Sequence, residues 1–118
     1  MYESGMAQPR YPNDGTISVL DELRRRAAVE PNDAADTVAK LTDIALHGMG
    51  QIGLFSTDIF APPDLFCRQK NGWLCFYVAK PLPPGDADVV ALLCVRFVPG
   101  TMARLEQEVA NRRALFGV

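Results

Sequence analysis

Hydrophobic residues recur along the first half of the chain with the spacing of amphipathic helices. Apolar positions three and four residues apart predict one helix that begins after Asp21 and a second that begins at Asn32 or Asp33. Pro31 separates the two, and Gly48 follows the second at the place of a C-terminal cap. Because one proline turn joins them, we expect an antiparallel helical hairpin.

The second half of the chain has the pattern of β-strands. Residues 65–69 and 73–78 flank Asn71-Gly72, which is typical of the two-residue turn of a β-hairpin. Residues 89–98 are apolar at nearly every position, which predicts a third strand in the middle of a sheet. Thr101 can then begin a last helix.

Together these patterns predict an α+β fold. Residues 16–20 alternate β-branched and small polar side chains, so we expect a short strand there, followed by the helical hairpin, a three-stranded antiparallel sheet and a C-terminal helix. Residues 1–15 end in a cluster of turn formers and are expected to be a flexible arm, with residues 16–118 as one domain.

Composition narrows the class of protein. The chain has 118 residues, of which 48% are hydrophobic, enough for a core without disulfides or metal. The longest apolar run is too short to cross a bilayer, and the N-terminus has no signal-peptide pattern, so no membrane partner is expected. Three cysteines without close spacing favour reduced thiols in the cytoplasm.

The hairpin turn fixes which side chains share a face of the sheet. It pairs Lys70 with Trp73, Arg68 with Cys75 and Phe66 with Tyr77, so these six lie on one face. The opposite face is apolar. Cations on a sheet can hold phosphates, and aromatic rings can stack on unpaired bases. Alternatively, the rings pack under helices and the cations stay at the rim.

Net charge is uneven along the chain. Residues 1–64 carry five basic and ten acidic side chains, whereas residues 65–118 carry seven basic and four acidic ones. Affinity for a polyanion would therefore lie in the C-terminal half, unless this is ordinary variation of surface charge.

Other motifs point away from cofactors and metals. Residues 48–53 match GxGxxG, but they follow a helix where a dinucleotide site needs a strand, so we interpret them as a helix stop. The only histidine, His47, falls in the last turn of a predicted helix. Cys67 and Cys94 are expected to be buried, and Cys75 is either buried or a reactive thiol. We predict neither a metal nor a cofactor.

Three stretches of the sequence are similar to parts of a known family. The second helix of that family and its loop are similar to VAKLTDIALHGMGQIG. Its central hairpin is similar to DLFCRQKNGWLCFYV. Its last strand and C-terminal helix are similar to VVALLCVRFVPGT and MARLEQEVANRR. With the element order, these stretches resemble the RelE/ParE/HigB superfamily of bacterial toxins, from about Thr16 to Arg113.

The resemblance implies the toxin of a type II toxin–antitoxin system, with a cognate antitoxin as partner. In the RelE and HigB branches it implies a metal-independent, ribosome-dependent mRNA endoribonuclease. By position, Arg68 matches the hairpin arginine of the family and Arg96 a second basic residue on the last strand, which makes them the candidate catalytic residues. Lys70, Trp73 and Tyr77 are the candidate RNA-binding residues.

Two departures from the family pattern keep other functions open. Leu74 stands where many members have a second arginine, and no histidine or tyrosine follows the last strand. The alternatives are a non-catalytic protein–protein inhibitor or adaptor of phage or prophage type, acting through the sheet surface, and a ParE-like toxin with a protein target. An open face that gathers the four residues Arg68, Trp73, Tyr77 and Arg96 would favour nucleic acid, whereas buried rings and scattered cations would favour the inhibitor.

Overall fold

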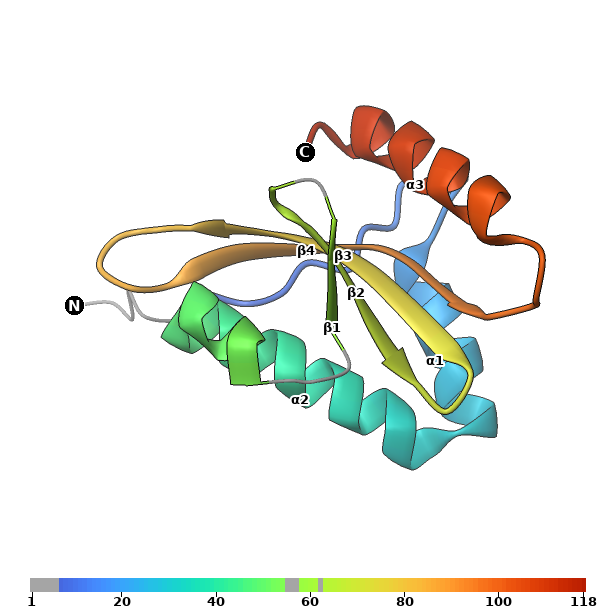
Figure 1. The fold of residues 1–118 in the computed structure, drawn as a ribbon, viewed down its shortest axis with the longest axis horizontal. Helices are drawn as coiled ribbons and strands as arrows, with labels where there is room; N and C mark the ends of the chain where they lie inside the picture. Colours follow the sequence, from blue (N-terminus) through green and yellow to red (C-terminus); the bar gives the residue numbers. More distant parts are fainter. Residues whose placement is uncertain (1–6, 55–57, 62) are drawn as a thin grey trace.

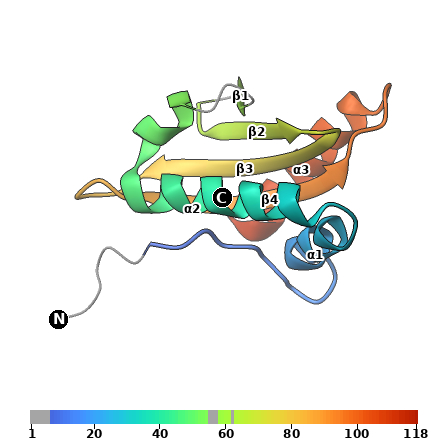
Figure 2. The same ribbon diagram turned by 90° about the horizontal axis from the view of Figure 1, so that it is seen from below.

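An antiparallel sheet lies between helices on both of its faces (Figure 1). The structure, a computed structural model, describes residues 7–54, 58–61 and 63–118. The strands follow the order of the sequence across the sheet: β1 (Asp58–Ala61), β2 (Leu65–Lys70), β3 (Trp73–Pro81) and β4 (Ala87–Arg96). On one face lie α1 (Val19–Val29) and α2 (Pro31–His47), followed by the short 3-10 helix η1 (Met49–Leu54). On the other face lies α3 (Met102–Phe116), as Figures 1 and 2 both show.

The α+β layout predicted from the sequence is confirmed, but the short strand predicted at residues 16–20 does not form. Ser18 makes only an isolated bridge to Asn13, and α1 begins at Val19. The reason is local: the Ser18 hydroxyl oxygen accepts a hydrogen bond from the backbone N–H of Asp21 at 3.0 Å, and acidic residues occupy the first turn. Residues 19–20 are therefore the first residues of a helix.

The helical hairpin forms as predicted, and single residues determine where α2 begins and ends. Pro31 occupies the first position of α2, where its missing N–H is not needed. Gly48 ends α2 with a φ of +91°, a backbone conformation that favours glycine. The GxGxxG stretch continues as η1, in line with a helix stop.

The β-hairpin has the predicted turn and register. Asn71 and Gly72 both have positive φ, at +51° and +85°, as a two-residue type I′ turn requires. Arg68 lies opposite Cys75, and Lys70 lies opposite Trp73. A fourth strand, β1, which the sequence pattern did not predict, pairs with the outer edge of β2.

Both faces of the sheet are buried. Under α1 and α2 lies a core cluster that includes Phe66, Cys75, Tyr77, Ala91 and Cys94. Under α3 lies a second cluster that includes Cys67, Leu74, Phe76, Leu92 and Val109. Burial on both sides explains why β3 and β4 are apolar at nearly every position.

The outer edge of β4 is covered in part by the N-terminal segment. The backbone N–H of Arg10 donates to the carbonyl of Val89 at 2.8 Å, and the N–H of Ala91 donates to the carbonyl of Arg10 at 2.9 Å. Tyr11 packs against the core under α1 and α2. The described part of the expected flexible arm is therefore docked on the sheet, and residues 1–6 lie outside the described residues.

Candidate functional site

The candidate RNA-binding face of the hairpin is covered by the helices α1 and α2. Tyr77 is fully buried and stacks on Phe66 with ring centroids 5.5 Å apart, and Trp73 is only 8% exposed. These rings are part of the protein core, as the alternative interpretation of the sequence held. In this conformation they offer no exposed face for stacking on a base.

The two cations of β2 share one carboxylate of α2. Arg68 is 5% exposed, and its Nη2 donates to Oδ2 of Asp36 at 2.9 Å. The Nζ of Lys70 lies 3.6 Å from the same oxygen. Burial acts to raise the pKa of Asp36, but the hydrogen bond and charge of Arg68 outweigh it, so the pKa of this carboxyl lies below its ordinary value. The open face that nucleic-acid binding would need is therefore not present at Arg68, which is buried against Asp36 of α2.

Arg96, the other candidate catalytic residue, is exposed at the end of β4. Its guanidinium carbon lies 5.8 Å from the centre of the Trp73 ring, within range of a cation–π interaction. A hollow of about 450 Å³ at the hairpin tip is lined by Lys70, Asn71, Trp73 and Phe97 among others. The structure therefore separates the two arginines: Arg68 is buried under α2, and Arg96 remains at the surface.

Arg26 is a buried cation that the sequence pattern did not single out. It is fully buried, its Nη1 donates to the hydroxyl of Thr37 at 2.8 Å, and its guanidinium carbon lies 5.7 Å from the centre of the Trp73 ring. Its Nε and Nη2 have no hydrogen-bond partner among the described residues. The signal was present in the sequence, because Arg26 follows Val19 and Leu23 at helical spacing and so shares their buried face.

The three cysteines are all buried, and the sheet separates them into two groups. Cys75 on β3 and Cys94 on β4 lie directly opposite each other, in the cluster under α1 and α2. Cys67 lies in the cluster under α3. Burial of Cys67 and Cys94 is confirmed, and Cys75 is buried as well.

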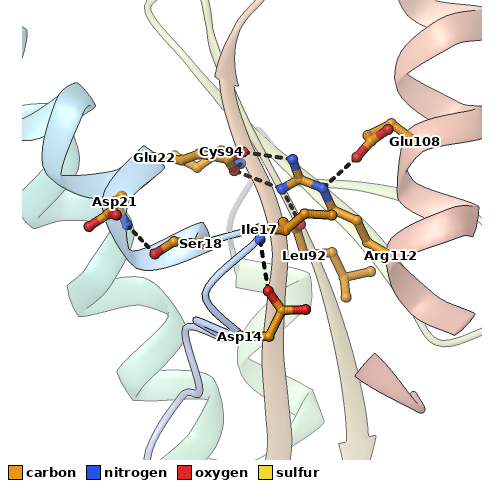
Figure 3. A network of polar contacts seen from close by, with 9 residues as sticks. All are labelled: Asp14, Ile17, Ser18, Asp21, Glu22, Leu92, Cys94, Glu108 and Arg112. Atoms are coloured by element: carbon orange, nitrogen blue, oxygen red, sulfur yellow. Dashed lines mark hydrogen bonds and ion pairs between the residues drawn. The ribbon is translucent and has the colours of Figure 1, made fainter. Parts of the chain in front are cut away.

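A network of charged side chains around the buried Arg112 lies at the outer edge of β4 (Figure 3). Arg112 of α3 donates through Nη1 and Nη2 to the two carboxylate oxygens of Glu22, at 2.9 and 2.8 Å. Its Nε donates to the carboxylate of Glu108 at 2.8 Å. Its Nη1 also donates to the carbonyl of Leu92 at 2.9 Å. Glu22 in turn accepts from the backbone N–H of Cys94 at 3.0 Å. Since these groups are paired with one another within the protein, the cluster joins α1, β4 and α3 as a structural element.

An apolar groove runs between α1 and α2 on their outer side. Its volume is about 460 Å³. The floor contains Leu23 and Ala34, both buried, and the exposed side chains of Ala27, Ala35 and Ala39 line it as well. The small alanine side chains leave the groove open, so it is accessible to a large side chain.

The part of the chain that the structure describes contains no grouping of metal ligands and no membrane-spanning helix. No three His, Cys, Asp or Glu side chains within it are grouped so that they could hold a metal ion. None of its helices is both long enough and apolar enough to cross a bilayer. His47 lies in the last turn of α2, where it was expected.

Comparisons of the chain with protein-family models, with curated proteins and with solved structures find no match. Function must therefore be inferred from the geometry of the molecule itself.

Proposed function

We propose that the protein is a non-catalytic protein-binding module, of the inhibitor or adaptor class, whose partner inserts a helix into the groove between α1 and α2. The observation that carries the proposal is the groove itself, an apolar concavity bordered by alanines on two antiparallel helices. Helix-in-groove recognition uses a surface of this kind, with apolar anchors at helical spacing on the partner. Arg24, whose side chain is 69% exposed, also lines the groove, where it is paired with Asp21 at 3.3 Å.

The state of the sheet cations supports a protein partner over a polyanion. A surface that attracts phosphates needs cations that a polyanion can reach, and Arg68 is buried. Arg68 and Lys70 both face Asp36, and the aromatic rings beside them are buried. We also propose a cytoplasmic location, because buried free thiols persist in reducing compartments.

Site-specific photo-crosslinking in cells tests the proposal. A photo-crosslinking amino acid at position 35 lies at the groove, and the same amino acid at position 110, exposed on α3, is the control. We expect a discrete protein adduct from position 35 only. Ala27→Arg, which fills the groove, should abolish that adduct, and Ala114→Arg on α3 should leave it unchanged, since both arginines suit an exposed helix.

Two results would contradict the proposal. One is the same set of adducts from positions 35 and 110, which would mean nonspecific contact. The other is an adduct with RNA in place of protein.

A second candidate function is the ribosome-dependent endoribonuclease implied by the resemblance to RelE-like toxins. The observation that favours it is the hollow at the hairpin tip, where Lys70 and Trp73 lie beside the exposed Arg96. Induced expression would then arrest translation, and Arg96→Ala would relieve the arrest. Unchanged growth with abundant folded protein would exclude this candidate. Arg68→Ala is an unsuitable test, because Arg68 is a buried partner of Asp36.

A further inference from the structure

We propose that Cys75 and Cys94 are a redox-active dithiol, which peroxide oxidises to a disulfide across the two central strands, with Arg26 as the cation that activates it. This site is separate from the groove and does not depend on the function proposed above.

The pairing of the strands brings the two sulfurs together. Cys75 and Cys94 are direct partners in the register of β3 and β4. The backbone N–H of Cys94 donates outward to Glu22 and not to β3, so the two cysteines form a non-hydrogen-bonded pair. In such pairs the Cα atoms lie about 4.5 Å apart, within the range of about 4.4–6.8 Å that disulfides span. The backbone therefore needs no large movement to close the bond.

Buried donors without partners surround this pair. The Nε and Nη2 of the fully buried Arg26 lack a partner in the described ranges of the chain, and so does the hydroxyl of Tyr11. Both residues interact electrostatically with the two thiols. Buried donors that are left unpaired cost free energy, and a negative sulfur or a sulfenate oxygen would satisfy them.

The charges around the pair favour Cys94 as the nucleophile. The hydrogen bond from Cys75 and the nearby Arg26 guanidinium lower the pKa of the Cys94 thiol, although burial and Glu22 oppose this. The same hydrogen bond, together with burial, raises the pKa of Cys75, which stays protonated. Tyr11 also stays protonated, because burial raises its pKa. Two further arginines lie close to the pair. Arg68 is opposite Cys75 in the register of β2 and β3 and is paired with Asp36, and Arg112 is paired with Glu22 and Glu108.

The chemistry balances with hydrogen peroxide as the oxidant. The Cys94 thiolate attacks one peroxide oxygen, the O–O bond breaks, and hydroxide leaves with a proton as water, so Cys94 becomes a sulfenic acid. The Cys75 sulfur then attacks the Cys94 sulfur, the S–O bond breaks, and a second water leaves with the proton of Cys75. Two thiols are oxidised and one peroxide is reduced to two waters. Because both sulfurs are buried, the peroxide enters during local opening of the structure.

Peptide mapping of the full chain tests the proposal. The reduced protein is treated with hydrogen peroxide, alkylated in denaturant and digested with trypsin. Because trypsin does not cleave before Pro81, Cys75 and Cys94 stay together in the peptide 71–96, and Cys67 falls in the peptide 41–68. We expect the peptide 71–96 to lose two hydrogen atoms and to escape alkylation. The peptide 41–68 should stay alkylated, and dithiothreitol should reverse the change.

Variants of α1 test the role of Arg26. Arg26→Met should slow the oxidation at neutral pH about tenfold, because loss of the cation raises the pKa of the Cys94 thiol. It should also shift the rate profile to higher pH. Arg26→Lys should restore part of the rate. Arg25→Met is the matched control, since Arg25 is the exposed neighbour on the same helix, and it should oxidise at the wild-type rate.

Three outcomes would overturn the proposal. They are full alkylation of all three cysteines after peroxide treatment, equal oxidation of Cys67, and conversion of Cys94 to sulfinic or sulfonic acid without a disulfide. A wild-type rate in folded Arg26→Met would remove Arg26 from the site. The mapping uses the wild-type chain, so it tests the dithiol even if a variant fails to fold.

Discussion

Replacing Arg112 by methionine removes the guanidinium that joins α1, β4 and α3 through its hydrogen bonds (Figure 3). Methionine keeps much of the aliphatic stem, so the loss is mainly polar. The side chain of Glu22, 11% exposed, would keep only its bond from the N–H of Cys94, and the carbonyl of Leu92 would lose its donor.

Removing one partner of a buried ion pair costs about 3–5 kcal/mol, because the other charge stays buried without its counter-ion. A domain of this size has a total free energy of unfolding of about 5–15 kcal/mol. We therefore expect Arg112→Met to lose a fifth or more of the stability, measured as a lower midpoint of urea unfolding followed by circular dichroism.

The neighbouring residue supplies a matched control. Arg113 also binds a carboxylate with two nitrogens, that of Asp64 at 3.0 and 2.9 Å. The Arg113 side chain is 25% exposed, compared with 9% for Arg112, so Arg113→Met should cost about 1 kcal/mol or less. Equal losses for the two variants, or a negligible loss for Arg112→Met, would refute the reasoning that burial makes the difference.

Three further predictions concern other parts of the fold. Gly48→Ala should destabilise the protein by several kcal/mol, because the new Cβ would clash with the carbonyl oxygen of Gly85 and would strain a backbone of positive φ. Gly100→Ala is the control, since Gly100 has a similar φ and no atom nearby, and it should cost about 1–2 kcal/mol in the same urea titration. Arg68→Ala should lower the melting temperature by several degrees, since it leaves Asp36 without its buried partner, and an unchanged melting temperature would contradict the ion pair. The pKa of Asp36 is lower in the folded protein than in the unfolded chain, so the carboxylate stabilises the fold above its ordinary pKa of about 3.9. This stabilisation is lost as the pH falls through the lower folded value. Asp36→Asn should therefore flatten the acid limb of a curve of stability against pH.

The local features of the fold could be predicted from the sequence because each depends on a few adjacent residues. Asn71-Gly72 determines the turn and with it the register of β2 and β3. The helical period and Pro31 determine the helical hairpin. The error at residues 16–20 has the same origin, because a short apolar run fits a strand or the first turn of a helix, and the Ser18 cap decides between them.

The candidate site depended on information that no short window of the sequence carries. Whether Arg68 faces solvent depends on Asp36, thirty-two positions away, and on the packing of α2 against the sheet. The burial of Trp73 and Tyr77 follows from the same packing. Strand β1 is four residues long and is defined by its pairing with β2, so it gave no clear pattern of its own.

The central claim is that a protein partner binds the groove between α1 and α2, and a titration of variants tests it most directly. The partner recovered by crosslinking from position 35 is titrated by calorimetry into the wild-type protein, Ala27→Arg and Arg96→Ala. Our account predicts that Ala27→Arg weakens the Kd at least about a hundredfold, or about 2.7 kcal/mol, and that Arg96→Ala leaves it unchanged within error. Binding that Ala27→Arg leaves intact and Arg96→Ala abolishes would contradict the account and would move the functional surface to the hairpin tip.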